Sequence, residues 1–352
     1  MKRVVYFFWL APICFAQEAG SGFDVRTTIS AGAFYSDQLT ETPRDGAPAA
    51  AGFRWVLYPT WKISSHWTVA GAIQTQSRPY LSEDFSSQGY GVRTNILQGY
   101  LCYSQFWNGG SVAVRMGQLS TAFGSFPLRY DDTDNPLIDL PTPYGYYYST
   151  VSILGHAGAQ VDANIGKVDF RAQLVNSSPA NPRSILAHDQ YANWAGGAGY
   201  TIRQGLRIGA STYHGPYLDR HSPFFFPGEA APVSLPATAF GVDAQWGHGA
   251  WNLYGEWQHF RMDYRAIPVF TEHAGYGEAR YVLSPRWYVA ARLGYVRANA
   301  FNGHQSYEFA AGYRANQYQV LKVGYEVAPG SLRNTVALQL VTSFRAFSIA
   351  AN

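Results

Sequence analysis

The feature that most constrains this chain is a long alternation of apolar and polar side chains. About sixteen stretches, each about ten to fifteen residues long, place apolar residues at every second position with polar or small residues between them. Successive side chains of a β-strand point to opposite faces, so the alternation is typical of strands with one apolar and one polar face. Within a bilayer, only a helix or a closed barrel can pair every backbone N–H and C=O group. The pattern therefore predicts an all-β fold, a transmembrane antiparallel β-barrel.

The alternating stretches define sixteen expected strands. Bacterial single-chain barrels close with an even number of strands, so the count is consistent with closure. We expect the strands at Phe23–Ser36, Ala51–Ser64, Trp67–Arg78, Val92–Trp107, Ser111–Leu119, Gly155–Asn164, Lys167–Ser177, Ala192–Arg203, Leu206–Gly215, Ala237–Gly247, Ala250–Arg261, Val269–Leu283, Arg286–Ala298, Gln305–Asn316, Tyr318–Ala328 and Asn334–Phe344.

The segments between these strands alternate in length. Those after even-numbered strands are short and contain turn-forming residues, for example Asn108-Gly109-Gly110 and Ser284-Pro285. Those after odd-numbered strands are mostly long. This asymmetry predicts short periplasmic turns at one end of the barrel, long external loops at the other, and both chain termini on the periplasmic side.

The alternation also assigns each side chain of a strand to the lipid or to the lumen. In the expected strand Arg286–Ala298, one face carries Trp287, Val289, Ala291, Leu293 and Tyr295, and the other carries Arg286, Tyr288, Ala290 and Arg292. A Lys or Arg on the lipid face at mid-membrane costs about 2–4 kcal/mol. The charged face is therefore expected to line a wet lumen.

The first residues have the pattern of an export signal. Lys2 and Arg3 are followed by Val4–Ile13, an apolar run too short to span a bilayer, and by a small residue at a plausible cleavage point. We predict a signal peptide over residues 1–16, a single barrel domain over residues 17–352, and a location in the bacterial outer membrane. The alternative interpretation of the apolar run is a membrane anchor or a buried first strand.

Composition and motifs disfavour an enzyme or a metalloprotein. Charged residues make up 14% of the chain and aromatic residues 16%, whereas a soluble domain usually has about a quarter charged residues. Cys14 lies in the signal, so Cys102 remains alone and can form neither an internal disulfide nor a metal knuckle. The sequence has no nucleophile elbow, metalloprotease motif or phosphate loop. We therefore expect no enzymatic activity, no cofactor and no bound metal.

The longest expected connection, Ser120–Leu154, is the candidate for narrowing the lumen. It is rich in Phe, Pro, Leu and Tyr, and a long loop of this composition is expected to fold inward rather than stand free in water. Because it follows the fifth strand, it would be the third external loop. Its predicted pore-constriction residues are Arg129, Asp131, Asp132, Asp134 and Asp139. The three aspartates at 131, 132 and 134 resemble part of a calcium loop, but the glycine and the distal glutamate of that loop are absent.

Inward-facing basic residues of the strands form the second part of the candidate site. A basic wall facing an acidic loop would produce a transverse field at the narrowest point, which orients polar solutes and disfavours apolar ones. The alternative is that these are solvated charges with incidental pairing, because six inward-facing acidic residues would dilute an anion preference: Asp162, Asp169, Glu256, Glu278, Glu308 and Glu326. The predicted lumen-wall residues are Arg54, Lys62, Arg115, Arg171, Arg207, Arg286, Arg292 and Arg314.

The run Val114–Tyr130, VRMGQLSTAFGSFPLRY, resembles the strand-to-loop passage of phosphate-selective porins of the O/P type, in the bacterial outer-membrane porin superfamily. The strand rhythm, the export signal and the long third loop are also similar to that superfamily, over nearly the whole mature chain. The last expected strand resembles the terminal strand by which outer-membrane barrels are recognised, although Arg345–Asn352 follow its final aromatic residue, Phe344. The resemblance implies a 16-stranded, trimeric, passive channel. The lysine cluster or arginine ladder of a phosphate channel is missing, so phosphate specificity is not implied.

The predicted function is an outer-membrane porin, a passive diffusion channel for small hydrophilic solutes with a weak anion preference. The expected partners are small hydrophilic solutes or ions, outer-membrane lipid and lipopolysaccharide, and further copies of the chain in a homotrimer, with no nucleic acid. The alternative is a non-channel outer-membrane barrel, such as an adhesin, a structural protein or a lipid-modifying enzyme. A soluble sandwich or propeller is disfavoured by the apolar outward face and the lack of a blade-length repeat.

Overall fold

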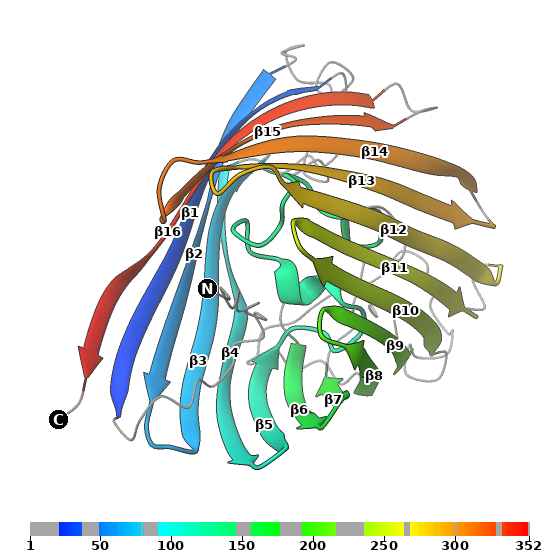
Figure 1. Cartoon of the computed structure of the whole chain (residues 1–352). Helices are drawn as coiled ribbons and strands as arrows, with labels where there is room; N and C mark the ends of the chain where they lie inside the picture. Colours follow the sequence, from blue (N-terminus) through cyan, green and yellow to red (C-terminus); the bar gives the residue numbers. More distant parts are fainter. Residues whose placement is uncertain are drawn as a thin grey trace.

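The structure is a closed barrel of sixteen antiparallel strands (Figure 1). This computed structural model describes residues 21–36, 49–78, 80, 91–145, 156–176, 192–215, 236–263, 268–299, 301–328 and 333–350. Each strand pairs with its sequence neighbours, and β1 pairs with β16 to close the ring. The expected fold class and strand number are confirmed.

The strand boundaries lie close to those expected from the sequence, with the largest shifts at the start of β14 and the end of β16. The strands are β1 (Gly22–Ser36), β2 (Ala49–Lys62), β3 (Trp67–Arg78), β4 (Gly91–Trp107), β5 (Gly110–Leu119), β6 (His156–Ile165), β7 (Val168–Asn176), β8 (Ala192–Arg203), β9 (Leu206–Gly215), β10 (Ala237–His248), β11 (Trp251–Met262), β12 (Phe270–Val282), β13 (Trp287–Ala298), β14 (Phe301–Arg314), β15 (Gln319–Ala328) and β16 (Arg333–Ala350).

The connections after even-numbered strands are tight turns, as expected, and they define what we call the turn end of the barrel. Gly166, between β6 and β7, has φ of 59°, and Gly205, between β8 and β9, has φ of 83°. A positive φ is accessible to glycine at little cost, which is why these two-residue turns can close. The first residue of β1, Gly22, pairs with Lys62 and with Ala350. The described chain therefore starts and finishes at the turn end.

The last strand differs from the expectation. We expected it to end at the aromatic residue Phe344, but β16 continues to Ala350. Thr342 pairs with the first residue of β15, and the Ser343 N–H donates to the Tyr318 carbonyl at 2.8 Å. Beyond Ser343, the extension is paired with β1 alone, across a register shift at Val25/Arg26. The pairing partner needed for this extension lies at the other end of the chain, so the local pattern of β16 could not predict it.

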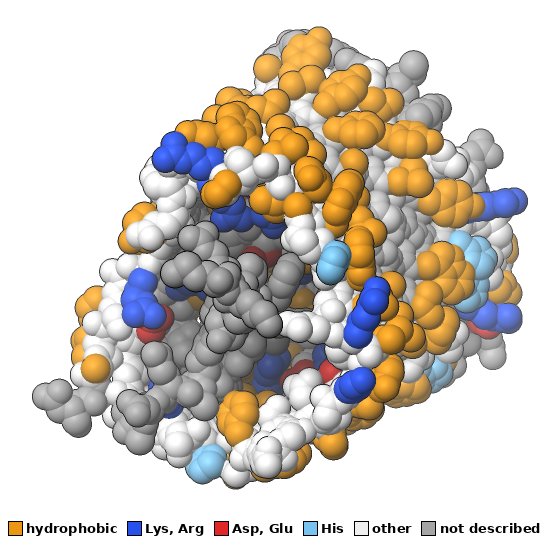
Figure 2. Space-filling model, in the orientation of Figure 1, with side chains coloured by type: hydrophobic (Ala, Val, Ile, Leu, Met, Phe, Trp, Pro, Cys, Tyr) orange, Lys and Arg blue, Asp and Glu red, His pale blue; other side chains and the backbone are white. Residues whose placement is uncertain are grey.

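The two faces of the strands differ as the alternation predicts. On β13, Trp287 and Leu293 are each 49% exposed, whereas Tyr288 and Arg292 are 3% and 4% exposed. Exposed apolar side chains cover the outside, and polar and charged side chains turn inward. Figure 2 shows this division, with hydrophobic side chains over the outer wall and charged side chains in the recess at the turn end.

The connection between β5 and β6 lies inside the barrel. We call its described part, residues 120–145, the lumen loop. It contains a short 3-10 helix, η1 (Phe126–Arg129), and a single helical turn, α3 (Thr142–Gly145), and Figure 1 shows it enclosed by the ring of strands. The inward folding of the third loop is confirmed. No helix in the described residues is long and apolar enough to cross a membrane.

Candidate functional site

The lumen loop enters the barrel along the inner faces of β7, β9 and β11. The backbone N–H of Ala122 donates to Gln173 Oε1 at 3.1 Å, and the N–H of Gly124 donates to Ser211 Oγ at 3.1 Å. Ser125 Oγ then donates to Glu256 Oε2 at 2.8 Å. Polar side chains of the wall therefore satisfy backbone groups that the loop would otherwise bury without partners.

Gly124 is required where the loop meets this wall. It has φ of 80°, and an added Cβ would collide with the Tyr144 hydroxyl and the Glu256 carboxylate. The Tyr144 hydroxyl, from α3, donates to Glu256 Oε1 at 2.5 Å, so both ends of the lumen loop meet at one carboxylate. Burial and the negative charge of Glu256 raise the pKa of Tyr144, which keeps its hydroxyl protonated as a donor.

The second contact of the loop is made by Arg129, at the end of η1. Its Nη1 donates to Glu278 Oε1 at 2.7 Å on β12, and its Nη2 donates to the Tyr276 hydroxyl at 3.0 Å. Its guanidinium carbon also lies 3.8 Å from the centre of the Tyr254 ring on β11. A predicted constriction residue is thus a contact that holds η1 against the wall.

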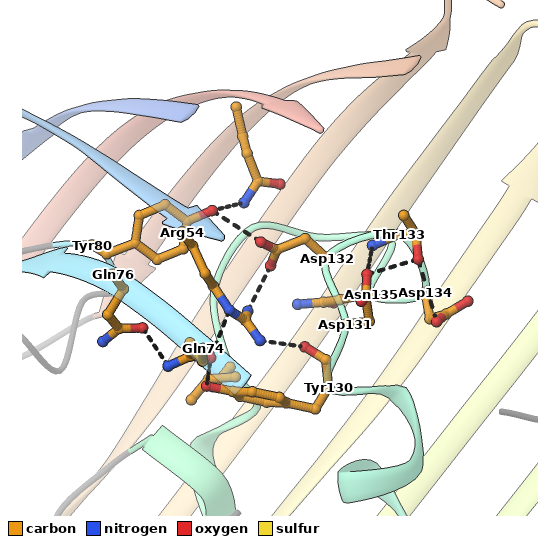
Figure 3. Close-up of polar contacts among 12 residues, drawn as sticks. Arg54, Gln74, Gln76, Tyr80, Tyr130, Asp131, Asp132, Thr133, Asp134 and Asn135 are labelled. Atoms are coloured by element: carbon orange, nitrogen blue, oxygen red, sulfur yellow. Dashed lines mark hydrogen bonds and ion pairs between the residues drawn. The ribbon is translucent and has the colours of Figure 1, made fainter. Parts of the chain in front are cut away.

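On the opposite side of the lumen, Arg54 of β2 binds the acidic part of the loop (Figure 3). Its Nη1 donates to Asp132 Oδ1 at 2.9 Å, its Nε donates to Gln74 Oε1 at 2.9 Å, and its Nη2 donates to the Tyr130 carbonyl at 3.2 Å. Arg54 is 1% exposed and Asp132 is 3% exposed. Asp132 Oδ2 also accepts a 3.0 Å hydrogen bond from the Tyr80 hydroxyl. The acidic loop and the basic wall are therefore in direct, buried contact.

The neighbouring aspartates have contrasting environments. Burial alone would raise the pKa of Asp131, but hydrogen bonds from the Tyr58 hydroxyl and from Thr133, with the charge of Arg54, lower it below its usual range. Burial and the charge of Asp131 raise the pKa of Asp134 to about 7. Asp131 is therefore an anion inside the barrel, whereas Asp134 titrates near neutral pH.

Lys322 of β15 is a central loop contact that the predicted site residues do not include. It is 1% exposed, and its Nζ donates to three carbonyls of the loop: Asp132 at 2.6 Å, Asn135 at 2.8 Å and Leu137 at 3.1 Å. The alternation of the sequence indicates its inward position, because Leu321 and Val323 face outward and Lys322 lies between them. Three carbonyls converging on one ammonium group fix the turn that carries the aspartates.

Arg292 of β13 forms the third cationic contact. It donates to Glu278 Oε2 at 2.8 Å, to Glu308 Oε2 at 2.8 Å and to Asn135 Oδ1 at 2.9 Å. It also donates to the Asp139 carbonyl at 2.9 Å. Asp139 takes part through its backbone, and its carboxylate accepts from the N–H of Leu140 at 2.8 Å. The network joins β12, β13 and β14 to the loop.

Two other predicted wall residues form ion pairs along the wall. Arg115 of β5 lies 3.5 Å from Asp162 of β6. Arg207 of β9 lies 2.6 Å from Asp169 of β7 and 2.6 Å from Asp243 of β10. These pairs connect adjacent and next-nearest strands of the wall.

The remaining four wall residues lie nearer the turn end. Lys62 is the half-buried last residue of β2, and Arg314 is the exposed last residue of β14. Arg171 is half-buried on β7, in register with Asp162. Arg286 was expected within a strand, but it lies in the exposed turn before β13.

The site therefore consists of a loop held across the lumen by buried charges from opposite walls. Of the predicted residues, the structure brings together Arg129, Asp131, Asp132, Asp139, Arg54 and Arg292. The wall residues that complete the contacts were not predicted as site residues: Tyr58, Tyr80, Glu256, Glu278, Glu308 and Lys322. Their inward orientation follows from alternation for those in strands, but their loop partners depend on barrel closure.

Comparison with known proteins shows which solved structures share this architecture. No protein-family model matches the sequence, and no curated protein is similar to it in sequence. Solved structures are similar in fold. OprB of Pseudomonas putida has a TM-score of 0.65 at 13% identity, over 92% of this chain and 94% of that one. A mutant porin of Rh. blastica has a TM-score of 0.54 at 12% identity, over 92% of this chain and 100% of that one.

A further similar structure is OmpT, an outer membrane protein of Vibrio cholerae, in its trimer form, with a TM-score of 0.55 at 12% identity over 92% of this chain and 100% of that one. With identities this low, the likeness concerns the fold. The chain has the fold of the outer-membrane porins, a 16-stranded barrel with its third loop turned inward.

Proposed function

We propose that the protein is a porin, a passive channel for small hydrophilic solutes in the bacterial outer membrane. The observation that carries the proposal is the combination of an apolar exterior with a charged interior, spanned by a loop that buried ion pairs hold in place. An apolar ring matches the hydrocarbon of a bilayer, and a charged bore is favourable where water enters. A loop fixed across the bore would set the size of solute that passes.

Conductance in planar bilayers tests the channel proposal. The purified full chain should insert in discrete steps of ohmic current, because a fixed loop leaves a constant cross-section. Electrically silent insertion of folded protein would overturn the proposal and favour the alternative of an adhesin, a structural barrel or a lipid-modifying enzyme.

We propose that the channel weakly prefers anions. The preference would arise from wall residues away from the part of the lumen loop that the buried ion pairs hold. Several inward-facing arginines form no ion pair within the described residues, among them Arg171, Arg280 and Arg314. The guanidinium of Arg280 lies over the Tyr288 ring, 4.6 Å from its centre. The acidic residue Asp132, by contrast, is compensated by Arg54. Uncompensated positive charge near the turn end would attract anions into the bore.

Reversal potentials in a salt gradient test the preference. The double variant Arg280→Gln and Arg314→Gln should lower the anion-to-cation permeability ratio, because it removes two charges that face the bore. Arg261→Gln, an exposed arginine on the outer face of β11, is the matched control and should leave the ratio unchanged. An unchanged ratio in the double variant would assign the preference elsewhere.

We further propose that residues 1–16 are a signal peptide and that the protein is a homotrimer. The basic and apolar pattern of the first residues supports the signal, and the trimer form of the Vibrio cholerae protein with a similar fold supports the assembly. Residues 1–20 lie outside the described residues. N-terminal sequencing of the exported protein and chemical cross-linking in membranes test the two proposals, with an intact N-terminus or monomers only as the contradicting results.

A further inference from the structure

Part of the described outer face of the barrel carries a row of basic side chains within an apolar surface. His259 of β11 pairs in register with His273 of β12, and His273 pairs in register with Arg297 of β13. His259 and Arg297 lie two positions from the exposed Trp257 and Tyr295 on their strands, and His273 is exposed between the buried Glu272 and Ala274. All three therefore face outward. Figure 2 shows histidine and basic side chains gathered over the ends of β11, β12 and β13 at the right of the view, among hydrophobic side chains. We call these three residues the basic row.

The basic row is compact. The rings of His259 and His273 have centroids 4.5 Å apart, and the Trp257 ring stacks on His273 at 5.7 Å with planes 28° apart. Residues directly opposite in adjacent antiparallel strands have Cβ atoms about 4.5–5.5 Å apart. Three groups that can carry positive charge or donate hydrogen bonds therefore lie within reach of one anionic group.

The backbone beside Arg297 leaves space for a ligand. The pairing of β13 with β14 shifts register between Val296 and Ala298, so Arg297 lies opposite a bulge. Bulges redirect side chains and end regular pairing. Gly303 lies beside Arg297, where an added Cβ would come within 3.2 Å of the Arg297 Cβ. A glycine at this position keeps the side of Arg297 open.

Acidic residues do not neutralise the basic row within the described part of the chain. Asp263, near the end of β11, forms its ion pair with Arg261, at 2.9 Å. Arg297 has no ion pair within the described residues. A positive group on the lipid-facing wall is unfavourable in hydrocarbon but favourable beside anionic headgroups. The charge on this surface is thus complementary to an anion at the membrane surface.

Beyond the basic row, the outward positions of β12 carry only small residues toward the turn end, and we call this strip the β12 groove. After His273, the outward positions of β12 are Gly275, Gly277 and Ala279. Trp257 and Tyr295 are the cross-strand neighbours of Gly275 on either side. A Cβ added at Gly277 would meet nothing within 4 Å, so the groove is open there. Gly275 itself is buried, so the open part begins at Gly277, whose cross-strand neighbours are Gly255 and Leu293. An exposed strip of small residues beside Leu293 can receive one hydrocarbon chain.

We propose that the basic row binds the phosphate-bearing headgroup of a membrane lipid, with one acyl chain of that lipid in the β12 groove. The headgroup phosphate would accept hydrogen bonds from the imidazole rings and the guanidinium, as phosphates do from arginine. The tail then continues along a surface that is already apolar. The same residues in a soluble protein would suit free phosphate, but the groove and the position on the outer wall favour the lipid.

The test is a titration of the detergent-solubilised full chain, with bound lipid counted by native mass spectrometry. Dioctanoyl phosphatidic acid should bind in preference to dioctanoyl phosphatidylcholine. The double variant His273→Gln and Arg297→Gln should weaken phosphatidic acid binding about fivefold or more, because it removes the charge of Arg297 and the imidazole of His273. Arg203→Gln, an exposed arginine at the turn end, is the matched control and should bind like the unsubstituted chain.

The groove is tested separately by Gly277→Leu, which fits the open space and fills it. This variant should reduce the advantage of longer-chain phosphatidic acid over the dioctanoyl form. Equal binding of the two headgroups, or unchanged binding in the double variant, would overturn the proposal. Competition by inorganic phosphate at the same concentration as lipid would also overturn it, because it would indicate a site for a soluble anion. Dissociation of an oligomer by the double variant would overturn it too, because it would indicate contact with a second copy of the chain. None of these variants should change the single-channel conductance. A failure of the lipid proposal can therefore be distinguished from a failure of the channel proposal.

Discussion

Arg54 illustrates how this barrel can hold a charge in its interior. Its guanidinium donates to Asp132, to Gln74 and to the Tyr130 carbonyl, and it stacks on the Tyr130 ring at 4.0 Å. A buried ion pair is favourable only when further hydrogen bonds satisfy both partners, because the loss of solvation is large. The planar, five-donor geometry of arginine meets this requirement here.

Removing the carboxylate should therefore be costly. Asp132→Asn would remove the carboxylate that pairs directly with the buried Arg54 guanidinium, and we expect a loss of about 3–5 kcal/mol in the free energy of unfolding. Denaturant titration of the barrel in detergent, with tryptophan fluorescence as the readout, measures this loss of stability. Asp24→Asn breaks the exposed pair with Arg345, whose side chain is 68% exposed, and should cost only about 0–1 kcal/mol. Equal effects of the two substitutions would contradict this interpretation of Arg54.

Asp134 should make stability depend on pH. Burial and the charge of Asp131 raise its pKa to about 7, so the folded state binds a proton that the unfolded state has released above its ordinary pKa. The stabilising contribution is complete below the ordinary carboxyl pKa and is lost as the pH rises through about 7. Between pH 4.5 and 7.5, the free energy of unfolding should therefore fall more for the unsubstituted chain than for Asp134→Asn. Parallel pH profiles would show that Asp134 does not titrate in this range.

At the scale of elements, the lumen loop is a separate unit that several strands hold in place. Its acidic turn is bound from β2, β13 and β15, whereas η1 and α3 are bound from β11 and β12. Long loops without such contacts are usually mobile. The contacts on both sides should keep the loop at one position across the bore, as a constriction of constant size requires.

Lys322 offers a direct test of this anchoring. Lys322→Met would leave three loop carbonyls without their donor, at a cost of about 3 kcal/mol or more, and the loop should leave its position for part of the time. We expect added current noise and more frequent closures in single-channel recordings. Lys167→Met, at the exposed turn between β6 and β7, is the control. A quiet, unchanged current from Lys322→Met would show that the other contacts suffice.

For the whole molecule, the division into a lipid face and a lumen face should determine where charge is tolerated. Leu293→Arg places a cation on the exposed outer face of β13 and should cost about 2–4 kcal/mol when the barrel folds into phospholipid vesicles. Ala113→Arg places it on the inner face of β5, in register with Asp162, and should be tolerated. Gel mobility of the folded and unfolded forms measures the difference. Comparable loss for both variants would contradict the assignment of faces.

The sequence by itself determined the two-faced strands, their number, the tight turns and the inward third loop. These features depend on local periodicity, on turn residues and on the composition of one segment, all of which can be read along the chain. The inward position of Arg54, Arg207 and Arg292 followed from the same alternation.

Only the tertiary structure decided which charges meet. Asp132 pairs with Arg54, 78 positions away, and its carbonyl with Lys322, 190 positions away. Closure of the ring and the path of the lumen loop bring these groups together, and no local pattern specifies either. The extension of β16 and the alignment of His259, His273 and Arg297 likewise depend on strand register. Register joins residues that are distant in the chain, so their partners become definite only when the whole barrel has formed.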